Sequence, residues 1–339
     1  MLRFLINSSK TIQPLKRNIF FTTTTFHRYV KKNLRTRLDN IKYEKKSVNN
    51  FYNPNQAKIV FQDTLPVRPL SHLFKALGFT LLVSVGAFTI GAIVQYERTK
   101  QKIRSVIRDM EGFFNNIIVN PNRPQIQFDL AQKVALAIIG TNIFVTILWK
   151  IPSLFPFMTT YFTNSFAQKY LCLPMLTSCF SHKVFLHLFL NMYVLWSFAP
   201  QTMGKLTGVE QFCALYASAG VFSSLASLTK NAIERSPVRS LGASGALLGI
   251  LMYTCMKVPD ARLQMFFLPF FDFSAKSAVC GILIFDFIGL LGPWKFFDHA
   301  AHLGGSLFGI WYATYGENFV KNWYNLKVID VYKKIKQDD

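Results

Sequence analysis

The feature that most constrains this chain is a series of long apolar blocks with almost no charge. The first block, residues 77–94 (LGFTLLVSVGAFTIGAIV), contains no charged side chain. A helix needs about 20 mostly apolar residues to cross the hydrocarbon core of a bilayer. Inside lipid, only a helix or a closed barrel satisfies every backbone polar group. The sequence therefore predicts an all-α membrane protein.

The composition supports this class. Of the 339 residues, 51% are hydrophobic and only 16% are charged, although the formal net charge is +21. Soluble domains carry about 25% charged residues, so the apolar blocks do not read as ordinary core helices. We expect seven helices, at residues 77–94, 134–151, 173–198, 212–228, 242–258, 275–291 and 300–315.

The N-terminus is basic and free of acids until Asp39, and it is rich in Thr and Ser. That profile predicts a mitochondrial transit peptide over residues 1–40. The alternative is a basic tail that binds nucleic acid or anionic lipid. Residues 41–70 are polar and interrupted by prolines, which favours a linker. The remaining predicted divisions are an extra transmembrane helix with a connecting segment (71–133), a core (134–316) and a polar C-terminal tail (317–339).

Polar residues inside the apolar blocks are candidates for function, because such groups are costly in a bilayer. The stretch FSHKVFLHLFLNMYVLW supplies His182, His187 and Asn191. His187 and Asn191 are four residues apart and share one helix face. His182 precedes His187 by five residues, which turns it about 140° away on a continuous helix. We therefore expect His187 and Asn191 to act together without His182.

Two further stretches, SLGASGALLG and DHAAHLGGSLFG, place a serine and a histidine beside small residues. Gly305 and Gly309 lie on the same helix face as His302, so a second helix can approach there closely. Gly245 and Gly249 form a matching strip beside Ser244. Helices packed through these strips would bring the Ser244 hydroxyl within hydrogen-bond reach of the His302 imidazole.

Such a pair has a clear chemical use. A serine hydroxyl is a weak nucleophile until a neutral imidazole accepts its proton. At a helix N-terminus, unpaired N–H groups and the helix dipole favour a developing oxyanion near Ser244. Gly242 and Gly245 allow a tight turn and close approach of a substrate backbone. His187 and Asn191 could add side-chain donors to the same oxyanion.

The three motifs together resemble a known family. HLFLN, GASG and AHLGGSLFG are similar to the signatures of rhomboid intramembrane serine proteases. The stretches NMYVLWSFA, SLGASGA and WKFFDHAAHLGG resemble more closely still their mitochondrial presenilin-associated rhomboid-like type. The resemblance covers roughly residues 150–316 and implies a six-helix rhomboid core preceded by one extra transmembrane helix. It implies that Ser244 is the nucleophile and His302 the general base of a dyad. His187, Asn191 and the Ser244 backbone N–H would then bind the oxyanion.

The resemblance also implies the reaction and its setting. We expect a serine endopeptidase of the mitochondrial inner membrane that cleaves single-span transmembrane proteins, using no cofactor or metal. Its other partner would be the lipid bilayer, with no role for nucleic acid. Leu248 stands where many bacterial members have a tyrosine that stacks on the catalytic histidine. Asp298 is expected to cap a helix, and neither Asp286 nor Lys276 is assigned a catalytic role.

Two other classes of protein compete with this interpretation. A metal-dependent enzyme would use histidines of the two His-containing stretches, but the chain has no H-E-x-x-H motif. A transporter would show inverted repeats or paired broken helices, which the sequence does not indicate. The histidines of the metal hypothesis are His182, His187, His299 and His302. The remaining alternative to a protease is a catalytically inactive scaffold that binds transmembrane helices.

Overall fold

The computed structural model describes residues 68–115, 128–265, 268–292 and 297–337. The predicted transit peptide and nearly all of the predicted linker lie outside the described residues. In chain order the elements are α3 (His72–Asn115), α4 (Leu130–Leu148), η1 (Pro152–Leu154), α5 (Phe155–Tyr161), α6 (Cys172–Thr177), η2 (Ser178–Phe180), α7 (Phe185–Thr202), η3 (Met203–Thr207), α8 (Val209–Ile233), α9 (Ser244–Lys257), β1 (Arg262–Met265), β2 (Leu268–Ser274), α10 (Ala275–Leu291), α11 (His299–Trp311), η4 (Tyr312–Gly316), α12 (Glu317–Phe319), η5 (Val320–Tyr324) and α13 (Asn325–Gln337).

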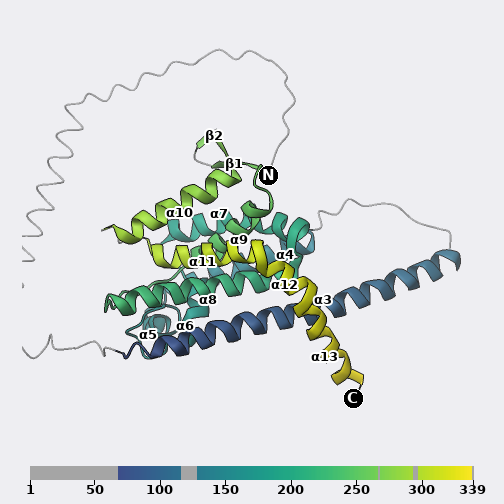
Figure 1. Ribbon diagram of the computed structural model, residues 1–339, viewed down its shortest axis with the longest axis horizontal. Helices are drawn as coiled ribbons and strands as arrows, with labels where there is room; N and C mark the ends of the chain where they lie inside the picture. Colours follow the sequence, from purple (N-terminus) through teal and green to yellow (C-terminus); the bar gives the residue numbers. More distant parts are fainter. Residues whose placement is uncertain (1–67, 116–127, 266–267, 293–296, 338–339) are drawn as a thin grey trace, which may run out of the picture. The chain divides into compact units, whose positions relative to one another are not determined.

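Helix α8 lies at the centre of the helical bundle (Figure 1). It packs against α3, α9 and α11. Of its most apolar stretch 67% is buried, against 22% for α3 and for α4. Small buried residues on α8, among them Ala214, Ser218 and Ala219, let neighbouring helices approach closely. Because α3 and α4 turn most of their apolar surface outward, those two helices present the surface that lipid would cover.

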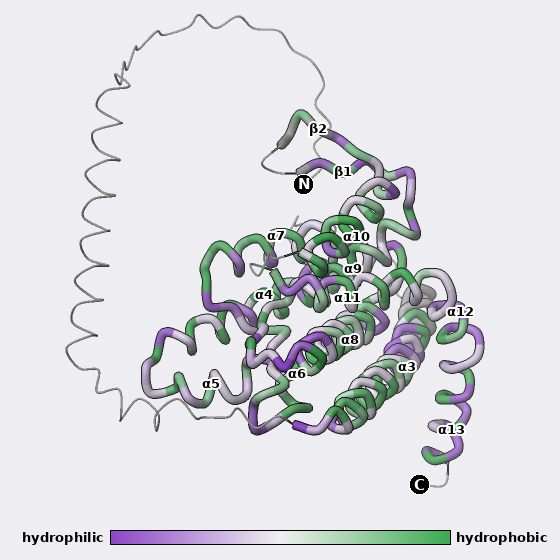
Figure 2. The backbone as a smooth tube through the Cα atoms, turned by 60° about the vertical axis from the view of Figure 1, so that its left-hand side comes forward, coloured by the Kyte–Doolittle hydropathy of each residue, from purple (hydrophilic) through white to green (hydrophobic). Residues whose placement is uncertain are grey.

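The helical membrane fold that the sequence predicts is confirmed. Helices occur in all seven predicted stretches, and hydrophobic residues run along them in Figure 2. Within the described residues, α3, α4 and α8 are long and apolar enough to cross a bilayer, and α6 to η3 adds a fourth span if that bent pair counts as one. Helices α9, α10 and α11 have 14, 17 and 13 residues, which is shorter than the usual span of about 20.

The prediction of one continuous helix over residues 173–198 is wrong. The stretch breaks into Cys172–Phe180 and Phe185–Thr207, which are bent by 83° relative to each other. The polar residues at the break find their partners elsewhere in the fold. Ser181 Oγ accepts a hydrogen bond from Trp149 Nε1 at 2.8 Å, and His182 Nε2 accepts one from the Ala243 N–H at 3.3 Å. These side-chain hydrogen bonds connect the break to α4 and to the segment before α9.

Local capping signals explain where two of the helices begin. Asp129 accepts a hydrogen bond from the Gln132 N–H at 2.7 Å, and the Gln132 side chain accepts one from the Asp129 N–H at 3.0 Å. This capping box starts α4 a few residues before the predicted boundary at residue 134. Ser274 caps α10 by accepting from the Ser277 N–H at 3.1 Å, and α10 has the predicted bounds 275–291.

Two regions differ from a bare bundle of transmembrane helices. Strands β1 and β2 form an antiparallel hairpin between α9 and α10, which the sequence did not predict. The predicted polar tail continues from α11 as helical structure, and α13 packs on α3. There the Tyr332 hydroxyl and Lys336 Nζ both donate to Glu97 Oε1, at 3.0 and 2.9 Å. Helix α13 alternates hydrophobic and hydrophilic residues in Figure 2, as expected for a helix outside the hydrocarbon core.

Candidate active site

The contact predicted between Ser244 and His302 is present. Ser244 is the first residue of α9, and its Oγ lies 2.9 Å from Nε2 of His302 on α11. The pair is partly buried, and the His302 side chain keeps 13% of its surface exposed. A serine hydroxyl in hydrogen-bond contact with an imidazole is the arrangement in which the ring can accept the hydroxyl proton.

The two helices meet through glycines, as the sequence predicts. A Cβ added at Gly305 would overlap the backbone carbonyl of Gly245, and one added at Gly309 would overlap the carbonyl of Gly249. Backbone therefore lies directly on backbone along this contact, which we call the glycine seam (Gly245, Gly249, Gly305 and Gly309). The seam fixes how far the start of α9 lies from the first turns of α11.

Backbone bonds hold the segment that leads into Ser244. Ser240 exchanges two backbone hydrogen bonds of 2.8 Å with Asn164, and the Gly242 N–H donates to the Ser178 carbonyl at 3.0 Å. Gly242 has φ of +132°, a conformation that residues with a side chain rarely adopt. It also leaves room for the His187 ring, because an added Cβ would lie 2.6 Å from His187 Cε1.

The predicted oxyanion donors lie on α7, beside this segment. The His187 ring contacts the position of Gly242, two residues before Ser244. Asn191 is buried, and its side-chain amide donates to the His187 carbonyl at 2.7 Å within α7. That bond uses one of the two amide hydrogens. At the start of α9, Ala243 has no side chain that could accept from the first-turn N–H groups.

The prediction that His182 stands apart from His187 is wrong. The two rings are 4.8 Å apart in an edge-on arrangement, and His182 is fully buried while accepting the Ala243 N–H. The 140° separation assumed one continuous helix, but α7 begins only at Phe185. His182 therefore supports the turn before Ser244 rather than facing away from it.

An acidic residue that sequence reasoning left without a role meets His302 from the other side. Asp286 on α10 is 1% exposed, and its Oδ1 lies 3.1 Å from His302 Nδ1 and 2.7 Å from His299 Nδ1. The imidazole of His302 thus lies between a hydroxyl and a carboxylate. A signal was present in the sequence, because a lone acid in an apolar helix is costly and needs a partner.

Aromatic rings and a further glycine surround this acidic contact. The Phe297 ring centroid lies 6.0 Å from that of His302, and Phe285 lies 5.4 Å from His299 in an edge-on arrangement. The His299 ring covers Gly289 of α10, where an added Cβ would overlap it. In place of a stacking tyrosine at Leu248, His302 is therefore held by Asp286 and flanked by Phe297.

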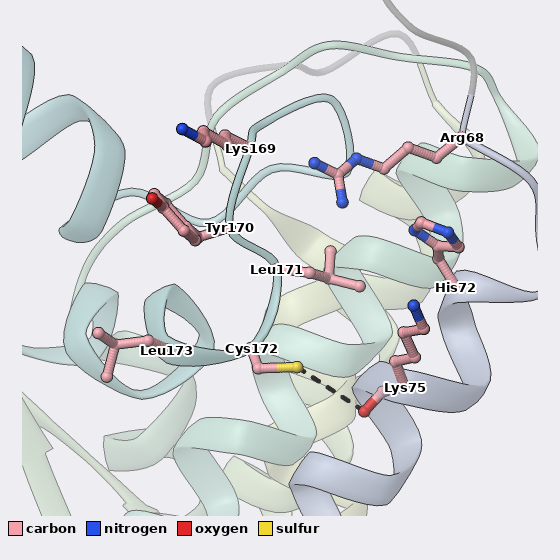
Figure 3. A pocket seen from close by; sticks show the side chains of 8 residues that line it. All are labelled: Arg68, His72, Lys75, Lys169, Tyr170, Leu171, Cys172 and Leu173. Carbon is pink, nitrogen blue, oxygen red and sulfur yellow. Dashed lines mark hydrogen bonds between the residues drawn. The ribbon is translucent and has the colours of Figure 1, made fainter.

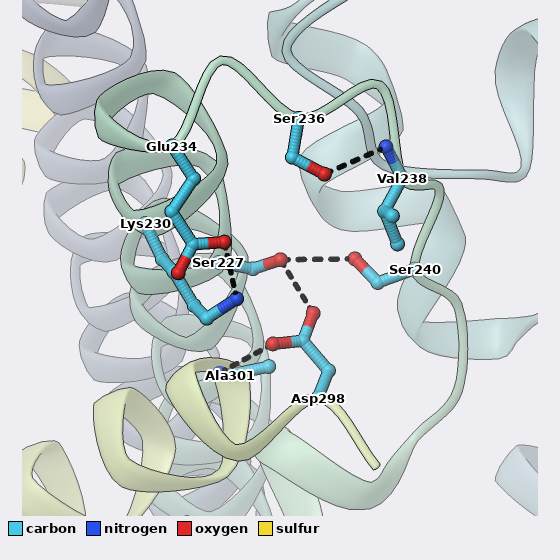
Figure 4. A network of polar contacts seen from close by, with 8 residues as sticks. All are labelled: Ser227, Lys230, Glu234, Ser236, Val238, Ser240, Asp298 and Ala301. Carbon is cyan, nitrogen blue, oxygen red and sulfur yellow. Dashed lines mark hydrogen bonds and ion pairs between the residues drawn. The ribbon is translucent and has the colours of Figure 1, made fainter. Parts of the chain in front are cut away.

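Asp298 has the capping role that the sequence predicts. Its Oδ1 accepts from the Ala301 N–H at 3.1 Å at the start of α11. Figure 4 shows its other oxygen facing Ser227 of α8, which in turn contacts Ser240. This network joins α8, α11 and the segment before α9. The Asp298 carboxylate is engaged there, away from the His302 ring nitrogens.

The structure groups other potential metal ligands than the four histidines that the sequence suggested. Asp286, His299 and His302 offer potential ligand atoms that lie within 4.8 Å of one another. In the structure the two Nδ1 atoms share one carboxylate oxygen. A metal ion there would have to replace both hydrogen bonds and would occupy Nδ1 of the histidine that faces Ser244. His182 and His187 lie in a separate contact of their own.

The fold and this arrangement define a helical membrane protein with a serine–histidine contact between two of its helices. The rhomboid domain family model matches residues 171–318, a range that contains both Ser244 and His302. The chain is 42% identical over 280 residues to the presenilin-associated rhomboid-like protein, mitochondrial, of Bos taurus, an alignment that covers 76% of this chain and 73% of the relative. The chain therefore belongs to the rhomboid family, and within it to the presenilin-associated rhomboid-like proteins.

Other relatives support the same placement. The Homo sapiens protein of the same name is 41% identical over 280 residues, with 76% of this chain and 73% of the relative covered. Rhomboid protein 1, mitochondrial, of Saccharomyces cerevisiae is 33% identical over 186 residues, covering 54% and 53% of the two chains. All three relatives are named as mitochondrial.

Proposed function

We propose that the chain is a serine endopeptidase of the mitochondrial inner membrane that cleaves single-span membrane proteins within or near the bilayer. The observation that carries the proposal is the 2.9 Å contact between Ser244 Oγ and His302 Nε2 on two helices of the membrane bundle. Membership of the rhomboid family and the mitochondrial names of the relatives support it.

The reaction would be acyl transfer. His302 Nε2 accepts the proton of Ser244 while Oγ attacks the peptide carbonyl carbon and forms the new C–O bond. The tetrahedral intermediate then collapses, the C–N bond breaks, and His302 returns the proton to the leaving amine. A water molecule, deprotonated by the same nitrogen, next attacks the ester. This step releases the acid product and restores the serine hydroxyl.

The oxyanion would be bound at the start of α9. The Ser244 backbone N–H lies at the helix N-terminus, where the helix dipole favours negative charge. Helix α7 supplies two side-chain donors for the oxyanion, the ring of His187 and the second amide hydrogen of Asn191. One such donor typically contributes about 3 to 4 kcal/mol to transition-state stabilisation.

Asp286 would act as a positioning residue for the base. When His302 Nδ1–H donates to the carboxylate, Nε2 keeps its lone pair and faces Ser244. The negative charge also stabilises the imidazolium that forms during attack. His299 holds the same oxygen from the other side at 2.7 Å. The dyad expected from the family resemblance would thus become a triad of Ser244, His302 and Asp286, in which the carboxylate orients the imidazole without taking up its proton.

The substrate must present an accessible carbonyl. In an α-helix each carbonyl accepts the N–H four residues further on, so a transmembrane substrate has to unwind locally before Ser244 can attack. Preferred substrates would carry helix-weakening residues in the membrane segment and a small side chain next to the cut. A single-span protein has no neighbouring helices within its own fold that would prevent this unwinding.

The proposal is tested by covalent labelling together with cleavage. The purified chain is treated with a fluorophosphonate probe and incubated with a single-span model substrate. We expect labelling and cleavage by the parent protein, and a fall of at least about a thousandfold in Ser244→Ala and His302→Ala. Ser306→Ala is the matched control, because this buried α11 serine has an Oγ with no hydrogen-bond partner in the described part of the chain.

Each outcome separates the competing classes of protein. Labelling that persists in Ser244→Ala would place the nucleophile elsewhere. Cleavage that a chelator abolishes, without labelling, would favour a metal site at Asp286, His299 and His302. A folded parent protein that binds the substrate but neither reacts with the probe nor cleaves would be a transmembrane-helix-binding scaffold, and the protease proposal would be wrong.

A further inference from the structure

A basic cavity lies far from Ser244 in the chain, where the start of α3 meets the loop before α6 (Figure 3). Its volume is about 390 Å³, and four basic side chains line it: Arg68, His72, Lys75 and Lys169. They come from two segments about a hundred residues apart in the sequence. The other lining side chains are aromatic, aliphatic or thiol groups, so none of the described residues that line the cavity carries a carboxylate.

Within the described residues, Arg68, Lys75 and Lys169 have no acidic partner. None of the ion pairs in the described part of the chain involves Arg68, Lys75 or Lys169. Figure 3 shows the polar ends of Arg68, His72 and Lys75 directed toward the same space above Leu171. An isolated interfacial lysine simply extends its head group into water. The positive charges of Arg68 and Lys75, directed at one hollow, repel each other until an anion occupies it.

The wall of the cavity is held in place by hydrogen bonds. Arg68 donates to the backbone carbonyl of Gln168. The buried Gln168 side chain donates to the carbonyls of Thr160 and Thr163 at 2.9 and 2.7 Å, and its oxygen accepts from Arg239 at 2.8 Å. One of the cations is therefore anchored to an ordered loop. A site that is organised before binding loses less free energy when its ligand arrives.

The surroundings of the cavity suit a lipid rather than a small soluble anion. The uncharged stretch of α3 starts at residue 76, directly after Lys75, so the cations lie at the edge of the hydrocarbon region. Leu173, which lines the cavity, is 49% exposed, and Phe74, the residue before Lys75 on α3, is 76% exposed. Tyr170 stacks on Tyr161 with ring centroids 5.2 Å apart, and tyrosines are enriched at membrane interfaces.

We propose that this cavity binds the phosphate group of an anionic membrane lipid, whose acyl chains lie along Phe74 and Leu173. The phosphate accepts hydrogen bonds from Arg68 and Lys75, as Arg and Lys commonly donate to phosphate. Bound there, the lipid joins the start of the extra helix α3 to the loop before α6. This inference does not depend on the proposed protease activity.

The test measures lipid retention by native mass spectrometry of the full chain in neutral detergent. The probes are phosphatidylglycerol, phosphatidylcholine and inorganic phosphate. We expect the parent protein to retain phosphatidylglycerol in preference to phosphatidylcholine. Each cation near a membrane surface contributes to anionic-lipid affinity, so Arg68→Gln/Lys75→Gln should bind phosphatidylglycerol roughly thirtyfold more weakly. The unfolding temperature of each variant shows that it is folded.

The matched control is Lys150→Gln/Arg235→Gln. Both residues are exposed, and they follow the ends of α4 and α8, so the control removes the same total charge without touching the cavity. Equal losses in both double variants, or no loss in Arg68→Gln/Lys75→Gln, would overturn the proposal. Displacement of phosphatidylglycerol by inorganic phosphate at an equal concentration would also overturn it, because the site would then select a free anion rather than a lipid.

Discussion

Helix α11 has two contact surfaces that are built in opposite ways. Toward α9 it offers the glycine seam, where backbone lies on backbone and an added methyl group would collide. Toward α10 it offers a polar contact, where the buried carboxylate of Asp286 meets the rings of His299 and His302. Apolar packing alone makes the first surface, whereas the second introduces an ionisable group into a membrane bundle.

The difference indicates what each surface contributes to the site. The seam sets the distance between Ser244 and His302, because helices without side chains between them approach until their backbones are in contact. The polar contact sets the orientation of the imidazole, because a ring held at Nδ1 must direct Nε2 toward Ser244. A buried acid in a bilayer carries a cost in stability, so its presence is best explained by function.

The largest effect is expected when the polar contact is broken by Asp286→Asn. The neutral amide no longer stabilises an imidazolium, so kcat should fall by about 10² to 10⁴ while KM changes little. The unfolding temperature should stay the same or rise, since a costly buried charge has been removed. Both quantities are measured with the model substrate in one detergent.

The control for that substitution is Asp272→Asn. Asp272 lies in the β-hairpin, is about half exposed and faces Arg262 at 3.7 Å, so the same chemical change there should leave kcat unaltered. If Asp286→Asn kept full kcat, the carboxylate would have only a structural role. A loss of activity that followed a loss of stability would argue for packing instead.

A substitution in the glycine seam should act mainly on folding stability. In Gly305→Ala the new methyl group meets the Gly245 carbonyl, and overpacking of this kind typically costs about 1 to 3 kcal/mol. Separation of α9 from α11 also lengthens the contact between Ser244 and His302, so cleavage should fall together with the unfolding temperature. Thermal unfolding and cleavage are measured on the same preparation.

Gly281→Ala is the matched control for the seam. A Cβ at Gly281 of α10 would have nothing within 4 Å, and replacing an unconstrained helical glycine by alanine typically stabilises by about 0.5 to 1 kcal/mol. Opposite signs for the two substitutions would support the close approach at Gly305. A Gly305→Ala protein as stable as the parent would contradict it.

The seam could be predicted from the sequence because it depends on local spacing. Gly305 and Gly309 follow His302 by three and seven residues on one helix face, and Gly245 and Gly249, four residues apart, form a strip beside Ser244. Small residues in such a pattern have few uses other than close helix packing. Two strips and two reactive side chains therefore predicted one contact, which the structure contains.

The polar contact could not be predicted in this way. Asp286 and His302 lie on different helices, 16 residues apart, and no spacing rule relates them. Asp298 is nearer to His302 in the sequence, four residues before it, but it caps α11 as the sequence predicts. His182 was misplaced for a related reason, since its helical phase holds only while the helix is continuous. Relations between separate elements depend on the fold and not on local periodicity.

The smallest effect is expected from substitution of Asp298. This prediction distinguishes the role of Asp298 as a helix cap from the role of Asp286 as the partner of His302. Loss of an N-cap side chain typically costs about 1 kcal/mol, so Asp298→Ala should lower the unfolding temperature modestly. Asp298→Asn should restore most of that stability, because asparagine caps a helix as well as aspartate does. In both variants the activity per folded molecule should stay close to that of the parent, because the carboxylate contacts Ala301 and Ser227 rather than the His302 ring. A large fall in kcat at unchanged stability in Asp298→Asn would instead make Asp298 the acid that serves His302.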